Sequence, residues 1–170
     1  MSGRAAIALG SNLESKFGDR EANLREAVRR IGALGEVQAV SSFYDTEPVG
    51  YLDQPRFLNG ALALDTELGP RELMRELLGV ERAMGRDRAA NQRADVVVKG
   101  PRVIDLDLLS YAERGDGDVV MATEELMLPH PEMQARRFVL EPLAEIAPEW
   151  VHPVLEVTVR EMLARLGRDG

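Results

Sequence analysis

Apolar and polar positions recur along the chain with two different periods, and each period indicates one kind of element. Leu58, Leu62 and Leu64 share one parity, which is typical of a strand with one buried face. Leu24 and Val28 are four residues apart, the spacing of one helix face. These periods predict strands over 4–9, 37–44, 56–66 and 103–111 and helices over 19–34, 70–84, 136–146 and 158–166.

Turn-forming residues separate these elements. Gly10-Ser11-Asn12 is predicted to stop the first strand, and Asp19 is predicted to cap the first helix. Pro70 stands at a position that the first turn of a helix tolerates. Residues 115–118 are predicted to form a turn and 119–121 a short extended segment.

The order of the elements is β-α-β-β-α-β, followed by two further helices. This order favours an α+β fold, specifically a ferredoxin-like sandwich with additional C-terminal helices. The chain has 170 residues, so we expect a single domain over 1–170.

Composition removes several classes of function. The chain has no cysteine and only two histidines, which excludes disulfides, thiolate metal sites and a His-rich metal site. Its net charge of −8 argues against general nucleic-acid binding. No apolar run of about 18 residues occurs and the start lacks the apolar stretch of a signal peptide, so we expect a cytoplasmic protein without a membrane partner.

One basic stretch stands out against this acidic background. Between Arg82 and Arg102 the chain has six basic and two acidic residues, a net charge of +4. Arg86, Arg88 and Arg102 could bind phosphates as forked donors. A solvated charged loop, or a structural ion pair with nearby acids, is the alternative for any one of them.

The basic stretch leads directly into Asp105 and Asp107. On a strand these two carboxylates point to one side, while Ile104, Leu106 and Leu108 point to the other. Mg²⁺ is commonly bound by one or two carboxylates together with substrate phosphates, so the pair could hold metal and nucleotide. The alternative is the polar face of a half-exposed strand.

Other candidate residues are weaker individually. His130 lies between two prolines in a loop predicted to be rigid and exposed, and it could reach a phosphate; a structural histidine is the alternative. Arg136 and Arg137 are predicted to open a helix and could add to the anion site, with simple surface exposure as the alternative. His152 has no comparable neighbours and is expected to be structural. The chain contains no P-loop sequence and no nucleophile motif.

Phe57 and Asn59 are predicted to share one strand face. An aromatic ring beside an amide could stack a flat bicyclic ligand and read its hydrogen-bonding edge, whereas an ordinary core Phe beside a capped Asn is the alternative.

Several segments, taken in order, resemble the 6-hydroxymethyl-7,8-dihydropterin pyrophosphokinases of folate biosynthesis. The most specific of them is Gly100-Pro101-Arg102-Val103-Ile104-Asp105-Leu106-Asp107. The others are Ala8-Leu9-Gly10-Ser11-Asn12-Leu13, Ser41-Ser42-Phe43-Tyr44, Thr46-Glu47-Pro48-Val49-Gly50, Asp53-Gln54-Pro55-Arg56-Phe57-Leu58-Asn59, Gly85-Arg86-Asp87-Arg88 and Pro129-His130.

The resemblance implies transfer of pyrophosphate from ATP to the pterin hydroxymethyl oxygen, with release of AMP. It implies two Mg²⁺ ions on Asp105 and Asp107, and catalytic roles for Arg86, Arg88 and Arg102. The implied ATP-binding residues are Glu81, Arg86, Arg88, Arg102, Leu108, His130 and Arg136. The implied pterin-binding residues are Thr46, Glu47, Val49, Phe57, Asn59, Asp105 and Phe138.

Three segments differ from the family pattern. Val98-Lys99 stands where the family usually has a tryptophan, the 89–99 loop is longer than usual, and Glu125-Leu126-Met127-Leu128 replaces a usual nucleotide contact. Two other interpretations remain beside the pyrophosphokinase: an ATP-using enzyme with another acceptor, and a non-enzymatic module such as an RNA binder. We expect a monomer, with a dimer left open.

Overall fold

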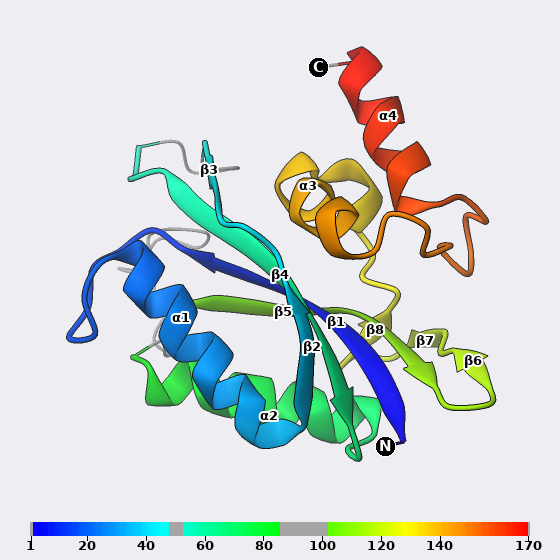
Figure 1. Cartoon of the computed structure of the whole chain (residues 1–170), viewed down its shortest axis with the longest axis horizontal. Helices are drawn as coiled ribbons and strands as arrows, with labels where there is room; N and C mark the ends of the chain where they lie inside the picture. Colours follow the sequence, from blue (N-terminus) through cyan, green and yellow to red (C-terminus); the bar gives the residue numbers. More distant parts are fainter. Residues whose placement is uncertain (1, 48–52, 86–101, 170) are drawn as a thin grey trace.

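A computed structural model describes residues 2–47, 53–85 and 102–169 (Figure 1). In chain order the elements are β1 (Gly3–Ser11), α1 (Arg20–Ile31), η1 (Gly32–Leu34), β2 (Glu36–Val40), β3 (Tyr44–Thr46), β4 (Phe57–Thr66), α2 (Pro70–Ala83), β5 (Asp105–Glu113), β6 (Gly117–Asp118), β7 (Met121–Ala122), β8 (Met127–Leu128), η3 (Met133–Ala135), α3 (Arg137–Ile146) and α4 (Val159–Asp169).

The main sheet is antiparallel throughout. Its strands lie in the order β2-β4-β1-β5-β6, and β3 extends the sheet by pairing with β4 beyond the end of β2. The two long strands β1 and β4 therefore lie at its centre, and β7 and β8 form a separate pair. The expected mixed α/β architecture with added C-terminal helices is confirmed at this level.

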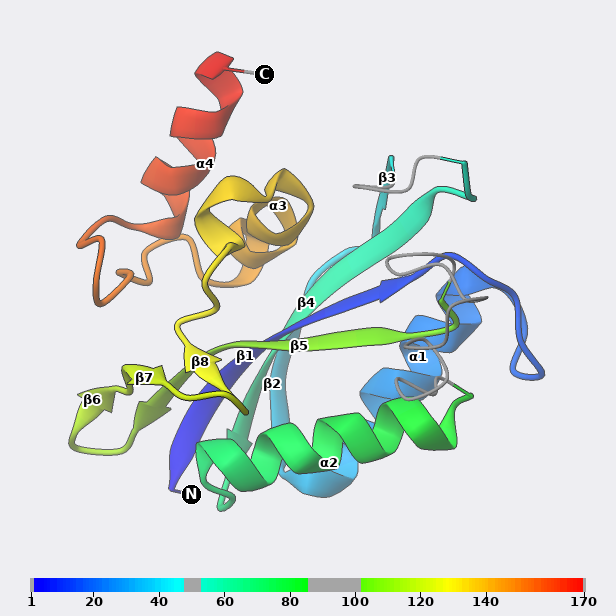
Figure 2. The same cartoon turned by 180° about the vertical axis from the view of Figure 1, so that it is seen from behind.

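Helices cover both faces of the sheet, as the two views show (Figures 1 and 2). On one face, α1 and α2 pack through Leu24, Leu73 and Leu77 onto apolar residues of β1, β4 and β5. On the other face, α3 packs through residues such as Leu140 onto small strand residues, and α4 packs on α3. The second apolar cluster covers only part of its sheet face and leaves the rest of that face to the site described below.

The predicted helix starts hold in detail. Asp19 is the N-cap of α1 and its side chain accepts a hydrogen bond from the Ala22 N–H at 2.9 Å, which satisfies one of the helix's unpaired donors. Pro70 is the first residue of α2, where the missing N–H costs no hydrogen bond.

The strand predicted over 37–44 is two strands, because the regular pairing with β4 is interrupted at Ser41. The Ser41 N–H donates to the Ala61 carbonyl, but the Ala61 N–H donates to the Ser41 hydroxyl, both at 2.9 Å. A side-chain oxygen thus replaces the carbonyl that a regular ladder would use, and β2 ends before β3 begins.

Three other boundaries differ from the predictions. Gly10 and Ser11 continue β1 instead of stopping it, because they remain paired with β4. β5 begins at Asp105, so Arg102 precedes the strand. Part of the turn predicted over 115–118 is β6, which pairs back onto β5.

None of the helices in the described ranges is both long enough and apolar enough to cross a membrane.

Candidate active site

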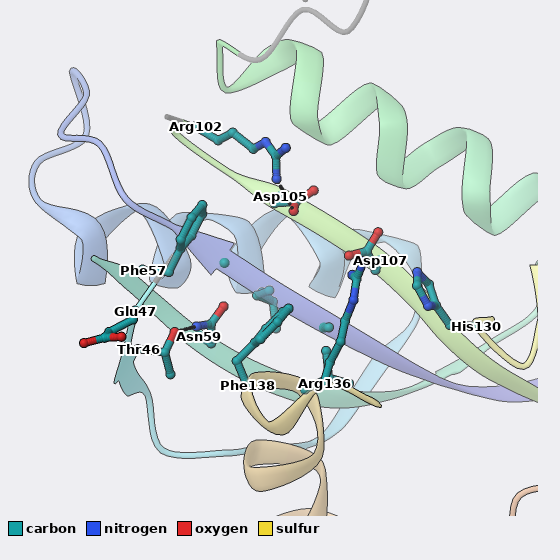
Figure 3. A pocket seen from close by; sticks show the side chains of 14 residues that line it. Thr46, Glu47, Phe57, Asn59, Arg102, Asp105, Asp107, His130, Arg136 and Phe138 are labelled. Atoms are coloured by element: carbon teal, nitrogen blue, oxygen red, sulfur yellow. Dashed lines mark hydrogen bonds and ion pairs between the residues drawn. The ribbon is translucent and has the colours of Figure 1, made fainter. Parts of the chain in front are cut away.

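A cavity of about 260 Å³ opens on the sheet face that α3 covers only in part (Figure 3). Its floor comes from the central strands β1, β4 and β5, and its sides come from β3, from α3 and from the chain segments that precede β5 and α3. Thr46, Glu47, Phe57, Asn59, Arg102, Asp105, Asp107, His130, Arg136 and Phe138 line it together with Ala8, Leu9, Gly10 and Val139.

Strand register explains why residues distant in sequence meet here. Asn59 on β4 pairs with Gly10 on β1, and Gly10 pairs in turn with Asp105 on β5. The next row on the same face runs from Ala61 through Ala8 to Asp107. Adjacent strands lie about 4.8 Å apart, so the Asn59 and Asp105 positions are about 10 Å apart across one glycine.

One end of the cavity holds an oriented amide between two aromatic rings. The Asn59 Nδ2–H donates to the Thr46 hydroxyl at 2.5 Å, which leaves the Asn59 carbonyl oxygen for a ligand. A Cβ added to Gly10 would stand 2.9 Å from that oxygen, so the glycine provides its space. Phe57 and Phe138 lie on either side of Asn59 (Figure 3).

The other end carries the paired carboxylates. Asp105 and Asp107 both face the cavity, while Ile104, Leu106 and Leu108 fill the core beneath the strand, as the period of two predicts. Past Leu108 the register shifts by one residue, so the alternation does not continue unbroken to the end of β5.

Arg102 is held at this end although it is not on a strand. Its guanidinium donates to Asp105 Oδ2 at 3.1 Å, and both side chains are largely buried. Its backbone is fixed by Asn12: the Arg102 N–H donates to Asn12 Oδ1 at 2.7 Å, and the Asn12 N–H donates to the Arg102 carbonyl at 3.0 Å. The structural ion pair considered from the sequence is therefore present inside the cavity.

His130 is half-buried, so its predicted exposure is wrong. The backbone N–H of His130 donates to the Leu109 carbonyl at 2.9 Å, which ties the loop to β5. Burial, and then the Arg136 cation, lower the pKa of His130, so the ring is neutral at pH 7. Its Nδ1 accepts the Glu132 N–H at 3.3 Å, which places the ring proton on Nε2.

Arg136 is the N-cap residue of α3, and its guanidinium extends toward the Asp107 side of the cavity (Figure 3). It pairs with Glu132 and lies 5.6 Å from the Phe138 ring centre. Arg137 instead pairs with Glu141 along the helix surface and does not line the cavity.

Two residues assigned to ATP from the resemblance lie beneath the cavity wall. Glu81 on α2 is 1% exposed, and its carboxylate accepts the N–H of Leu106, between the two aspartates, at 2.8 Å. Leu108 is 2% exposed and its side chain packs in the core, so only its backbone could face a ligand. Arg86, Arg88 and Val49 lie outside the described residues.

The sequence interpretation missed part of the cavity wall. Ala8, Leu9, Gly10 and Val139 line the cavity without having been assigned to it. Ala8 and Gly10 could have been found from the sequence, because residues two apart on a strand share a face, and two small residues in succession leave space on that face. His152 lies apart from the cavity: it is 4% exposed, and its Nδ1 accepts the N–H groups of Val154 and Leu155 at 3.2 and 3.0 Å.

The residues that line the cavity lie in a segment that matches a known protein family. A family model described as 7,8-dihydro-6-hydroxymethylpterin-pyrophosphokinase (HPPK) matches residues 6–148. The chain belongs to this family. The match covers every described residue that lines the cavity.

Full-length relatives agree with this assignment. A 2-amino-4-hydroxy-6-hydroxymethyldihydropteridine pyrophosphokinase of Methylorubrum extorquens is 43% identical over 98% of this chain and 96% of its own length. The Bacillus subtilis protein with the same name is 44% identical over 86% of this chain and 79% of its own length.

Some relatives are much longer than this chain. The folic acid synthesis protein fol1 of Schizosaccharomyces pombe is 37% identical over 98% of this chain, which spans 21% of that protein. An HPPK-DHPS structure from Plasmodium falciparum has a TM-score of 0.73 at 16% identity, and this chain covers 44% of it. That likeness shows the fold.

Proposed function

We propose that this chain transfers pyrophosphate from ATP to the hydroxymethyl group of 6-hydroxymethyl-7,8-dihydropterin, releasing AMP, in folate biosynthesis. The observation that carries the proposal is the row Asn59–Gly10–Asp105. It sets an aromatic and amide site beside a carboxylate and cation site, with no side chain between them. Family membership and the names of the full-length relatives support the same activity.

The pterin belongs at the aromatic end. Phe57 and Phe138 stack on the bicycle, and the Asn59 carbonyl accepts a ring N–H while Thr46 holds the amide in that orientation. Glu47 and Val49 complete this end in the proposal. The hydroxymethyl group then points across Gly10 toward Asp105.

The triphosphate belongs at the charged end. The two carboxylates offer hard oxygen ligands on one wall, which fits Mg²⁺ shared with substrate phosphates. We assign two ions to Asp105 and Asp107, and contacts with the phosphates to the Arg102 and Arg136 guanidiniums and the His130 Nε2–H. Arg86 and Arg88 are assigned to the same phosphates from the sequence.

Glu81 and Leu108 contribute differently from the phosphate ligands. Glu81 holds the backbone between the aspartates by its bond to the Leu106 N–H, and so fixes the strand that presents both carboxylates. Leu108 can contribute only through its backbone, since its side chain is in the core.

In the proposed step, the pterin hydroxymethyl oxygen forms a bond to the β-phosphorus of ATP. The bond from that phosphorus to the oxygen bridging to the α-phosphate breaks, AMP leaves with that oxygen, and the hydroxyl proton is released to solvent. Bound Mg²⁺ would neutralise phosphate charge. The protein's own residues supply position and positive charge, because this chemistry requires no covalent intermediate.

Strand order β2-β4-β1-β5 supports describing the β-α-β-β-α-β part as ferredoxin-like. We also propose that the chain acts as one catalytic domain, as a monomer in the cytoplasm, on two small-molecule substrates and without nucleic acid.

The products of the reaction test the proposed function. The protein is incubated with ATP, Mg²⁺ and 6-hydroxymethyl-7,8-dihydropterin, and nucleotides are separated by chromatography. AMP and pterin diphosphate should form in equal amounts, and omission of the pterin should abolish AMP. ADP as the main product would instead identify a simple kinase.

A further inference from the structure

The short strand β3 has more influence on the pterin end than its length suggests. It has three residues and pairs within the described sheet with β4 alone. Its last residue, Thr46, orients the Asn59 amide. A three-residue pairing gives little stability by itself, so the position of β3 depends on what else holds it.

Side-chain contacts hold β3 on both of its faces. On the face away from the cavity, Asp45 accepts from Arg20 at 3.0 Å and from Arg56 at 2.6 Å. On the cavity face, the Tyr44 hydroxyl donates to Glu145 Oε1 at 2.9 Å. Tyr44 lies directly opposite Asn59 in the strand pair, so a displacement at Tyr44 reaches the recognition amide.

Glu145 uses both carboxylate oxygens on this segment. Besides the Tyr44 contact, its Oε2 accepts the Ser42 N–H at 2.5 Å. The backbone hydrogen bond from Ser42 is the largest cause that lowers the pKa of Glu145, so the carboxylate is charged at neutral pH and both bonds are charge-assisted.

Glu145 lies on the same helix as a residue that lines the cavity. Glu145 lies near the C-terminal end of α3, and the first turn of the same helix carries Phe138, a wall of the cavity. The Glu145 carboxylate therefore connects the helix that bears Phe138 to the strand that orients Asn59. Helix α3 packs against the part of the sheet that β3 and β4 form (Figures 1 and 2).

We infer that Glu145 is a positioning residue for pterin binding: its bridge to Tyr44 and Ser42 sets the spacing between the Phe138 wall and the Thr46–Asn59 pair. It does so without lining the cavity. The inference rests on the proposed function. Both carboxylates and Arg102 come from β5 and the segment before it, and only Arg136 at the charged end adjoins α3, so the bridge should affect the pterin more strongly than ATP.

The test compares two substitutions at Glu145 with one control on the same helix. Glu145→Ala removes both bonds while keeping a good helix former. Glu145→Gln retains the shape: its oxygen can accept the Ser42 N–H and its amide can donate to the Tyr44 oxygen. Glu141→Ala, one turn earlier, removes the ion pair with Arg137 and leaves both hydrogen bonds of Glu145 in place.

Glu145→Ala should raise KM for the pterin about five- to tenfold, the scale of one or two lost hydrogen bonds, with KM for ATP changed less than about twofold. Glu145→Gln should restore most of the pterin affinity, and Glu141→Ala should match the wild type. Tyr44→Phe, which keeps the ring, should give an intermediate effect. Equal increases in both KM values, or no rescue by Gln, would overturn the inference.

Amide hydrogen exchange provides a readout that does not depend on turnover. Residues 42–46 should exchange faster in Glu145→Ala than in Glu141→Ala, with the thermal midpoints of both variants recorded. If residues 42–46 exchange at the same rate in both variants, the inference that Glu145 holds this segment is wrong, even if the wild type is active. If the wild type releases no AMP, the proposed function fails, and the exchange measurement still decides whether the bridge exists.

Discussion

At the scale of single residues, the alternation of side chains along β5 both fills the core and places Asp105 and Asp107 in the cavity. The alternation that buries Ile104, Leu106 and Leu108 places both carboxylates on the opposite face, inside the cavity. Their neighbours then determine their role. Arg102 pairs with Asp105, and Glu81 holds the backbone between the two from below.

Replacing either carboxylate should cost turnover without costing the fold. Asp105→Asn or Asp107→Asn should lower kcat by at least about 10²-fold, the scale of losing one preorganised charged group. Asp116→Asn, in the exposed turn before β6, is the matched control and should leave kcat unchanged. Steady-state kinetics at saturating Mg²⁺ measure kcat, and thermal melts measure whether the fold is retained. Near-normal turnover in either variant would show that the two aspartates form only the polar face of a strand.

Gly10 is a second position where a single side-chain atom, the Cβ that glycine lacks, would change the cavity. A Cβ there would meet Asn59 Oδ1 at 2.9 Å and the Phe57 ring at 3.7 Å. The Asn59 amide that would have to shift is the one that Thr46 orients.

Gly10→Ala should therefore raise KM for the pterin by about tenfold or more, the equivalent of roughly 1.4 kcal/mol, with little change in ATP affinity. Gly32→Ala is the control, because a Cβ at Gly32 meets nothing within 4 Å. Calorimetric titration of each substrate separates the two affinities. Equal losses for both substrates would mean that the substitution distorts the whole sheet.

At the scale of elements, the segment before α4 depends on a buried neutral histidine. His152 Nδ1 accepts two backbone N–H groups, and burial lowers the pKa of the ring. The folded state therefore binds the proton less well than the unfolded chain. Its contribution is complete above the unfolded pKa of about 6.5 and is lost as pH falls through the lower folded pKa.

The free energy of unfolding should accordingly fall between about pH 7.5 and 5.5, above the range where most carboxylates titrate. His152→Asn retains an acceptor oxygen near the Nδ1 position and has no titration there. Urea unfolding of this variant should show a shallower pH dependence than the wild type. His130, whose pKa is also lowered, contributes to the remaining slope. An unchanged slope would mean that protonation of His152 does not destabilise the fold.

At the scale of the whole molecule, the two faces of the sheet serve different purposes. The face under α1 and α2 is filled by large aliphatic side chains. The other face has Ala8, Gly10 and Ala61 at its centre, and α3 covers only part of it, with α4 packed on α3. The helices that follow the β-α-β-β-α-β part therefore do more than extend the core, since α3 brings Phe138 and Val139 to the cavity.

The sequence by itself determined the elements and the facing of their residues. Helix starts at Asp19 and Pro70, and the shared face of Asp105 and Asp107, follow from capping chemistry and from the period of a strand, which are local properties. The ordered motifs also identified the family that the comparison shows. The roles of the individual site residues remain predictions, and Arg86, Arg88 and Val49 also lie outside the described residues.

Only the tertiary structure decided which residues meet. Gly10 was interpreted as a turn residue and is the cavity floor, because pairing with β4 and β5 continues past it. His130 was expected to be exposed and is half-buried, because its loop is tied to β5. Glu81 supports the wall from beneath, and Glu145 reaches β3 from another helix. Register and helix docking join positions distant along the chain, and no local period contains that information.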